Sequence, residues 1–254
     1  MLSVLIARPL EAAQALAEQI DLPGVQSLVM PFYTFAAQTP DLDVAAWLGS
    51  TKGRRLVVFT SPRAVEFGLH WIPENQRSAL EFATVGDATR LALEAAGVTV
   101  SWLPEQGYTS EDLLALNALR SDPGAALVMC APDGRGVLKP ALQDSGWLAE
   151  NVMVYQRVAI APVKEQLDRL MAADSLLTVW TSTSALEGAE QNLPPEAWSK
   201  ILGQPALVIS SRIKHHLQAR GAADIHMANG PGNPDLLQSI RTYVEDHHRW
   251  QREI

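Results

Sequence analysis

Short apolar runs alternate along this chain with longer stretches in which apolar residues recur every three or four positions. Val4–Ala7, Leu56–Phe59 and Ala125–Cys130 are runs of the first kind, and Leu10–Ile20 and Asp87–Gly97 are stretches of the second kind. Continuous apolar runs of this length predict strands buried on both faces, and the longer period predicts amphipathic helices. Their alternation predicts an α/β fold with parallel sheets that helices cover on both sides.

One motif occurs twice. The segment FTSPRAVE recurs 121 residues later as WTSTSALE, so that Thr60-Ser61 matches Thr181-Ser182. Further matches at offsets of 123 and 124 residues extend the repeat over most of the chain. They define two copies of a two-strand unit (1–33 and 125–156) and two copies of a three-strand unit (55–119 and 176–243). One copy of each gives five strands, which is the size of a flavodoxin sheet.

The lengths of the connections indicate which units share a sheet. The turn at 121–124 is tight, whereas the connections 34–54 and 158–175 are long, and elements with short connections usually pack together. The middle of the chain is therefore predicted to form one domain and the two ends another, with a cleft between the two lobes. The predicted bounds are 38–157 for the inserted domain, 1–35 plus 160–254 for the discontinuous domain, and 32–37 and 155–161 for the crossings. A simple tandem that divides near residue 122 is the alternative.

The two Thr-Ser turns stand where strands end and helices begin, which is where open parallel sheets bind ligands. A hydroxyl side chain at this position also caps a helix, and Pro62 suits the first helical position. The free N–H groups at a helix start attract carboxylate or phosphate groups. Two such turns, one in each lobe, would hold one large anionic ligand from both sides. Helix capping and anion binding therefore remain two alternative roles for these turns.

Composition narrows the range of partners. The net charge of −8 argues against a nucleic acid, because phosphate binding needs a basic face. The apolar runs are too short to predict a membrane-spanning helix, and the first residues have no basic region of a secretory signal. Cys130 is the only cysteine, so no internal disulfide is possible and the cytoplasm is the expected compartment. Because Cys130 lies within an apolar run, we interpret it as a core residue, with a reactive thiol as the alternative.

The usual cofactor motifs are absent from the sequence. Gly134-Arg135-Gly136 is followed by Val137, Leu138 and Lys139, which breaks the G-x-G-x-x-G fingerprint of dinucleotide binding. Neither a Walker loop nor a G-x-S-x-G nucleophile motif is present, and no histidine has the company of other metal ligands. The sequence therefore predicts no cofactor and no metal.

FTSPRAVE after a strand, VGDAT at a helix start (Val85–Thr89) and VYQRV (Val154–Val158) resemble uroporphyrinogen-III synthases, and the resemblance covers nearly the whole chain in order. The resemblance implies two flavodoxin-like domains joined by a two-stranded connector. It implies a cofactor-free, monomeric enzyme of haem synthesis that cyclises linear hydroxymethylbilane to uroporphyrinogen III, with loss of water and inversion of the last pyrrole ring. A transient contact with the preceding enzyme of the pathway is a further expectation.

The same resemblance assigns roles to individual residues. Tyr155, in VYQ, is the expected acid for the departing hydroxyl, and its match in the internal repeat is Phe32, which has no hydroxyl. A tyrosine that only packs is the alternative. The residues expected to bind substrate carboxylates are Thr60, Ser61, Arg63, Thr89, Thr181 and Ser182.

Three further arginines are expected to assist at the site. Arg8 and Arg135 follow strands, where structural salt bridges are the alternative. Arg212 stands in a Ser-Ser-Arg-Ile turn where the family has a Gly-Pro-Thr-Thr-like turn, so it would replace the contacts of that turn. The competing hypothesis for the whole chain is a two-lobed module that binds a small anion or regulates without catalysis.

Overall fold

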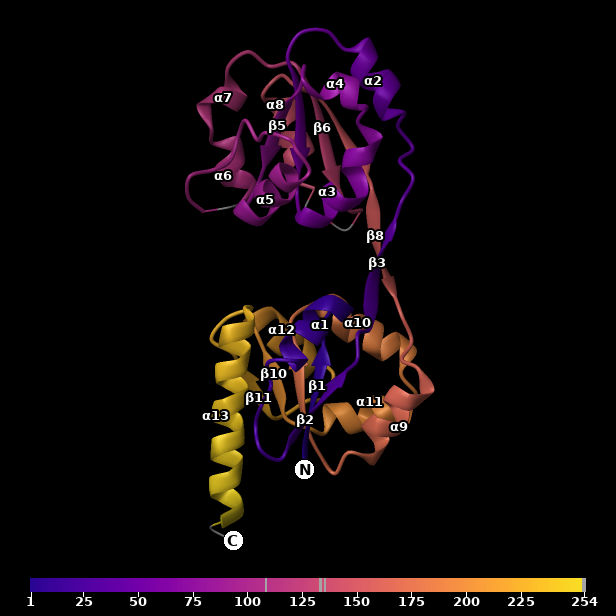
Figure 1. The fold of residues 1–254 in the computed structure, drawn as a ribbon, viewed down its shortest axis with the longest axis vertical. Helices are drawn as coiled ribbons and strands as arrows, with labels where there is room; N and C mark the ends of the chain where they lie inside the picture. Colours follow the sequence, from indigo (N-terminus) through magenta and orange to yellow (C-terminus); the bar gives the residue numbers. More distant parts are fainter. Residues whose placement is uncertain (108, 133, 135, 253–254) are drawn as a thin grey trace. The chain divides into compact units, whose positions relative to one another are not determined.

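The computed structural model describes residues 1–107, 109–132, 134 and 136–252, and their side chains up to residue 246. The chain folds into two compact units. Unit 1 consists of Met1–Thr34 and Val158–Ile254, and unit 2 consists of Phe35–Arg157. Figure 1 labels the helices and strands of both units.

Unit 1 is built on a five-stranded sheet in the order β11-β10-β9-β1-β2, in which all the recorded pairs are parallel. Its strands are β1 (Leu2–Ala7), β2 (Val25–Val29), β9 (Ser175–Trp180), β10 (Ala206–Val208) and β11 (Ile225–Met227). Its helices are α1 (Leu10–Ala17), α9 (Lys164–Ala172), α10 (Thr183–Asn192), α11 (Pro195–Leu202), α12 (Ser211–Gln218) and α13 (Asn233–Arg252). Numbered along the predicted two-strand and three-strand units, the sheet order is 2-1-3-4-5, which is the flavodoxin order.

Unit 2 is built on a four-stranded parallel sheet in the order β5-β4-β6-β7. Its strands are β4 (Arg55–Phe59), β5 (Glu81–Thr84), β6 (Ala125–Cys130) and β7 (Leu148–Met153). Its helices are α2 (Val44–Ser50), α3 (Pro62–Gly68), the 3-10 turn η1 (Leu69–Trp71), α4 (Glu74–Arg77), α5 (Asp87–Ala95), α6 (Ser110–Leu114), α7 (Asn117–Arg120) and α8 (Leu138–Asp144). The strand pairs β1–β2 and β6–β7 occupy equivalent places, so the internal repeat is a structural repeat. The predicted α/β class with parallel sheets is confirmed.

One predicted strand is reduced to a single contact. The three-strand unit predicted over 55–119 needs a third strand after α5, yet the segment Val98–Leu103 makes only one isolated parallel bridge, between Ala83 and Trp102. The N–H groups of Ser101 and Trp102 both donate to the carbonyl of Phe82, at 2.8 and 3.1 Å. Pro104 follows closely and has no N–H with which to continue a ladder. The prediction of a full strand here was wrong.

A separate two-stranded sheet pairs β3 (Tyr33–Ala37) with β8 (Tyr155–Ala159). The N–H of Gln38 donates to the carbonyl of Val154 at 2.9 Å, and the N–H of Ile160 donates to the carbonyl of Phe32 at 3.0 Å. These two strands include the two places at which the chain passes from one unit to the other.

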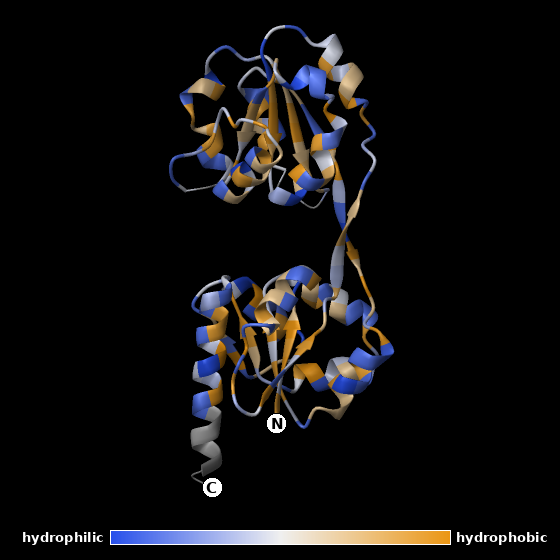
Figure 2. Ribbon diagram, in the orientation of Figure 1, coloured by the Kyte–Doolittle hydropathy of each residue, from blue (hydrophilic) through white to orange (hydrophobic). Residues whose placement is uncertain are grey.

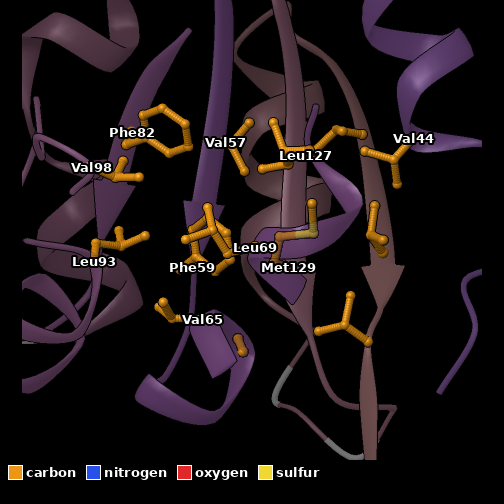
Figure 3. Close-up of a cluster of buried hydrophobic side chains, with 14 of the residues drawn as sticks. Val44, Val57, Phe59, Val65, Leu69, Phe82, Leu93, Val98, Leu127 and Met129 are labelled. Atoms are coloured by element: carbon orange, nitrogen blue, oxygen red, sulfur yellow. The ribbon is translucent and has the colours of Figure 1, made fainter. Parts of the chain in front are cut away.

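Strand β4 shows why the central strands are mainly apolar. Val57 and Phe59 face one core of unit 2, whereas Leu56 and Val58 face the core on the other side of the sheet. Figure 3 shows the first of these cores, in which Val57 and Phe59 lie beside Leu127 and labelled side chains from the covering helices. Because successive side chains on a strand point to opposite faces, a sheet covered on both sides buries both faces of its central strands, which are therefore mainly apolar.

Hydropathy follows the same layers in both units. Figure 2 shows predominantly hydrophobic strands in the middle of each unit and helices that carry hydrophilic residues on their outer sides. In unit 1, Leu236, Ile240 and Val244 of α13 recur at helical spacing and pack against Val4 and Ile6 of β1. Among the described helices, none combines the length and the apolar character needed to cross a bilayer.

Candidate active site

A pocket of about 290 Å³ lies within unit 2, at the ends of β4, β6 and β7. Its position agrees with the general rule that parallel sheets bind ligands beyond the carboxyl ends of their strands. The polar residues in its lining are Thr60, Ser61, Ser110, Cys130, Asn151, Tyr155 and Arg157. The described part of the lining contains one arginine and no aspartate, glutamate or histidine. The pocket is therefore suited to a ligand with negative charge, and its ionisable groups are few.

Tyr155 is held firmly in the lining. The residue is only 5% exposed, and its ring stacks on Phe67 with 5.8 Å between the centroids. A second ring, that of Phe35, makes an edge-to-face contact with it, with 5.7 Å between the centroids. The phenol oxygen lies 3.0 Å from the hydroxyl oxygen of Ser61. Packing on two rings and one hydrogen bond thus fix the orientation of this phenol beside the pocket.

Ser61 serves two partners at once. Its hydroxyl oxygen accepts a hydrogen bond from the N–H of Ala64 at 3.1 Å and so caps α3, as the sequence suggested. The same oxygen is hydrogen-bonded to Tyr155. Ser61 therefore both caps α3 and lines the pocket.

Thr60 directs its hydroxyl proton into the protein. Its hydroxyl donates to the carbonyl of Met129 at 3.1 Å, and its backbone N–H donates to the same carbonyl at 3.2 Å. The side chain lines the pocket, but its only hydroxyl proton is engaged by the end of β6. Its oxygen keeps lone pairs that can accept a hydrogen bond.

Two arginines lie over the ring of Phe35. The guanidinium carbon of Arg63 is 5.1 Å from the ring centroid and that of Arg157 is 5.8 Å from it. Arg63 also pairs with Glu66, one turn along α3, at 2.5 Å. Arg157 lines the pocket and Arg63 does not. The predictions from the sequence omitted Arg157, although the period of two along β8 places it on the same face as Tyr155.

One other predicted residue of unit 2 lies apart from this group. Thr89 is 3% exposed, in the first turn of α5, and does not line the pocket. Arg135 falls outside the described residues. Cys130 does line the pocket, and burial raises the pKa of its thiol to about 11, so it is protonated at neutral pH.

The second Thr-Ser turn makes the equivalent arrangement within unit 1. Ser182 caps α10 by accepting from the N–H of Ala185 at 3.2 Å, and its hydroxyl donates to the phenol oxygen of Tyr33 at 3.4 Å. Tyr33 opens β3 as Tyr155 opens β8. The structural match of Tyr155 is therefore Tyr33, and the match with Phe32 expected from an offset of 123 residues was wrong by one position. Thr181 precedes the cap and is partly buried.

The remaining predicted arginines belong to unit 1. Arg8 is partly buried after β1 and donates from Nη1 to Oδ1 of Asn233 at 2.7 Å. Burial lowers the pKa of its guanidinium below the ordinary value, and the nearby Tyr33 acts in the opposite direction. Arg212 is exposed at the second position of α12. Ser210 caps this helix by accepting a hydrogen bond from the N–H of Ile213 at 3.4 Å.

A larger hollow, of about 570 Å³, lies elsewhere in unit 1, between β11 and α13. Its lining includes Asp224, His226 and Tyr243, and His226 pairs with Asp224 at 2.8 Å. None of the site residues predicted from the sequence lines this hollow. Size alone therefore does not identify the site, and the chemistry of the lining favours the smaller pocket of unit 2.

Comparison with known proteins adds independent evidence. Residues 14–238 match the family model described as uroporphyrinogen-III synthase HemD. The chain is 27% identical, over 248 residues, to the uroporphyrinogen-III synthase of Salmonella typhimurium strain LT2, in a match that covers 94% of this chain and 100% of that protein.

Two crystal structures share the fold. The uroporphyrinogen-III synthetase of Helicobacter pylori 26695 matches with a TM-score of 0.62 and 14% identity, over 96% of this chain and 100% of that one. A mutant uroporphyrinogen III synthase of the extremely thermophilic bacterium Thermus thermophilus matches with a TM-score of 0.58 and 19% identity, over 97% of this chain and 100% of that one. Because the family model spans most of the sequence, the chain belongs to the uroporphyrinogen-III synthase family.

Proposed function

We propose that this protein is a uroporphyrinogen-III synthase, which closes hydroxymethylbilane to uroporphyrinogen III with loss of water and inversion of the terminal pyrrole ring. Membership of the family supports the reaction. The observation that carries the proposal to a residue is the phenol of Tyr155, fixed at a pocket whose described lining contains no carboxylic acid and no histidine. We propose further that the protein acts as a monomer in the cytoplasm, with at most a transient contact to the preceding enzyme.

The reaction requires one proton for the departing hydroxyl and a substrate held in a folded conformation. The bond between carbon and the hydroxymethyl oxygen breaks, and the adjacent pyrrole nitrogen supplies electron density to the carbon. Tyr155 gives its phenol proton to the departing oxygen, which leaves as water. For the inversion, the carbon of the terminal ring that already carries the chain attacks first and forms a spiro intermediate. Its bond to the chain methylene then breaks, and the free α-carbon of the same ring attacks that methylene, closes the macrocycle and releases a proton when the ring becomes aromatic again. That proton balances the one used, and holding the substrate folded supplies much of the remaining effect.

The substrate is a multiple carboxylate, and the polar lining is suited to it. Arg157 places a positive charge at the pocket, and the hydroxyls of Thr60 and Ser110 are further polar contacts in the lining. In unit 1 we propose that Arg8, Thr181, Ser182 and Arg212 contact other carboxylates. Arg63, Thr89 and Arg135 have the same proposed role in unit 2. No step in this scheme requires a metal or an organic cofactor.

The decisive experiment measures isomer composition. The purified protein is incubated with enzymatically prepared hydroxymethylbilane without added metal or cofactor, the products are oxidised, and the type I and type III porphyrins are separated. We expect the type III isomer in clear excess. Product that consists only of type I, which forms without an enzyme, would overturn the proposal.

A further inference from the structure

The hydroxyl of Ser61 has two hydrogen-bonding partners among the described residues, and together they leave it little freedom. A serine hydroxyl has one proton to donate and two lone pairs that can accept. One lone pair accepts from the N–H of Ala64 at 3.1 Å, and the remaining contact is the phenol oxygen of Tyr155 at 3.0 Å. The direction of the second bond decides where the phenol proton points.

We propose that Ser61 donates its proton to Tyr155, so that the phenol proton is directed into the pocket. This inference rests on the proposed function, because it concerns how the acid of that reaction is oriented. Ser61 is then a positioning residue, which acts through Tyr155 and does not itself hold a substrate carboxylate.

Two observations favour this direction. A hydroxyl that already accepts a hydrogen bond is polarised and becomes a better donor, so the N–H of Ala64 strengthens donation by Ser61. Besides Ser61, the partners of Tyr155 among the described residues are the rings of Phe35 and Phe67, which offer the phenol proton no oxygen or nitrogen acceptor. The pocket is therefore the direction left for that proton.

The arrangement also stabilises what remains after proton transfer. When the phenol proton moves to the departing hydroxyl, the tyrosine oxygen becomes a phenolate and the carbon–oxygen bond sends its electron pair to the leaving water. The Ser61 hydroxyl then donates to a charged oxygen, and such hydrogen bonds are roughly twice as strong as neutral ones. The proton released from the attacked ring carbon restores the phenol. The interaction gains strength in the transition state, so its loss should reduce kcat more than it affects KM.

Kinetics of a double-mutant cycle test the inference. We expect Ser61→Ala to lower kcat by about 10-fold with KM changed less than twofold, and Ser61→Thr, which keeps the hydroxyl, to recover most of the loss. In a Tyr155→Phe background, Ser61→Ala should cost less than a further twofold. A raised KM at unchanged kcat would show carboxylate binding, and an equal loss in both backgrounds would show an independent role; either would overturn the proposal.

A matched control separates positioning from capping. Asp43 caps α2 by accepting from the N–H of Ala46 at 2.9 Å and is exposed, outside the pocket lining. Asp43→Ala should lower stability as the loss of a cap does, by a few degrees in Tm, without changing kcat. If it lowers kcat as Ser61→Ala does, the loss reflects a missing cap and the proposal fails.

A spectroscopic readout does not depend on activity. In protein labelled with ¹³C at the tyrosine ζ-carbon, Ser61→Ala should shift the resonance of Tyr155 and leave that of Tyr33 in place. Ser182→Ala should do the reverse, because Ser182 is bonded to Tyr33. An unmoved Tyr155 resonance in Ser61→Ala overturns the pairing even if the enzyme is active, whereas the expected shifts in a protein without type III product would leave the pairing and refute only the proposed function.

Discussion

The phenol of Tyr155 and the phenol of Tyr33 stand in equivalent positions, each within hydrogen-bonding distance of the serine that caps the helix after the Thr-Ser turn. The two copies differ in what packs on the ring. In unit 2, Phe67 stacks on Tyr155, whereas the residue at the matching repeat position in unit 1 is Gly188, which instead admits the backbone at Phe32. The two turns are thus similar, but only the tyrosine of unit 2 has Phe67 stacked on its ring.

Tyr155→Phe tests whether that tyrosine supplies the proton. The change keeps the ring and its packing, so the fold should survive, while kcat for type III product should fall by roughly 100-fold with KM nearly constant. Steady-state kinetics with enzymatically prepared hydroxymethylbilane provide the measurement. Tyr243→Phe, which removes a phenol hydroxyl from α13 in unit 1, is the control and should leave kcat unchanged. Wild-type turnover in Tyr155→Phe would remove this residue from the mechanism.

The sequence predicted the layers of the fold because the layers depend on local periodicity. Strand β4 is apolar at every position from Leu56 to Phe59, which is the pattern that burial on both faces demands. The expected strand around Trp102 failed for a reason beyond local pattern, since the N–H groups of Ser101 and Trp102 both meet the one carbonyl of Phe82.

The candidate site was less predictable, because its decisive contact joins distant residues. Ser61 and Tyr155 are 94 residues apart, and their hydrogen bond depends on where β8 starts relative to α3. No local sequence pattern predicts where β8 starts relative to α3. The sequence therefore indicated only a helix cap or an anion site at Thr60-Ser61, and not the contact with Tyr155. Arg157 is different: alternation along β8 from Tyr155 would have identified it.

Gly188→Ala should destabilise the protein, although alanine usually favours a helix. A Cβ atom at Gly188 would lie 2.3 Å from the carbonyl oxygen of Phe32, which accepts a hydrogen bond from Ile160. The backbone must shift to admit the methyl group, and overpacking of this kind costs about 1–3 kcal/mol. Urea unfolding measures the difference in the free energy of unfolding.

Gly49→Ala is the matched control for that substitution. Gly49 lies in α2, and a Cβ atom there would have no neighbour within 4 Å. The control should raise the free energy of unfolding by about 0.5–1 kcal/mol, because alanine reduces the freedom of the unfolded chain. Equal effects of the two substitutions would contradict the close approach at Phe32.

Glu81 should make stability depend on pH in the acid range. Hydrogen bonds from Arg54, at 2.7 and 2.9 Å, and from Trp102 lower the pKa of Glu81 below its ordinary value of 4.5, against an opposing effect of burial. Because the folded pKa is the lower one, the carboxylate stabilises the fold fully above about pH 4.5 and loses this effect as the pH falls through the folded value.

Glu81→Gln should therefore lower the free energy of unfolding at pH 7 by about 1 kcal/mol, a modest amount because the Glu81 side chain is 34% exposed. The difference from wild type should stay constant down to about pH 4.5 and shrink below it. Glu94→Gln, which removes an exposed partner of Arg90, should change stability less than Glu81→Gln does at pH 7. A difference that grows on acidification would contradict the sign of this argument.

Cys130 should react slowly although it lines a pocket. Burial raises the pKa of its thiol from 9.0 to about 11, so at pH 8 the thiolate is roughly 100-fold scarcer than in an ordinary cysteine, and the thiolate is the species that alkylating agents attack. Because the chain has a single cysteine, incorporation of iodoacetamide followed by mass spectrometry reports on this residue alone. The folded protein should react about 100-fold more slowly than the same protein in urea, with Cys130→Ser as the blank. A folded-state rate equal to the rate in urea would mean that the fold does not hold this thiol protonated.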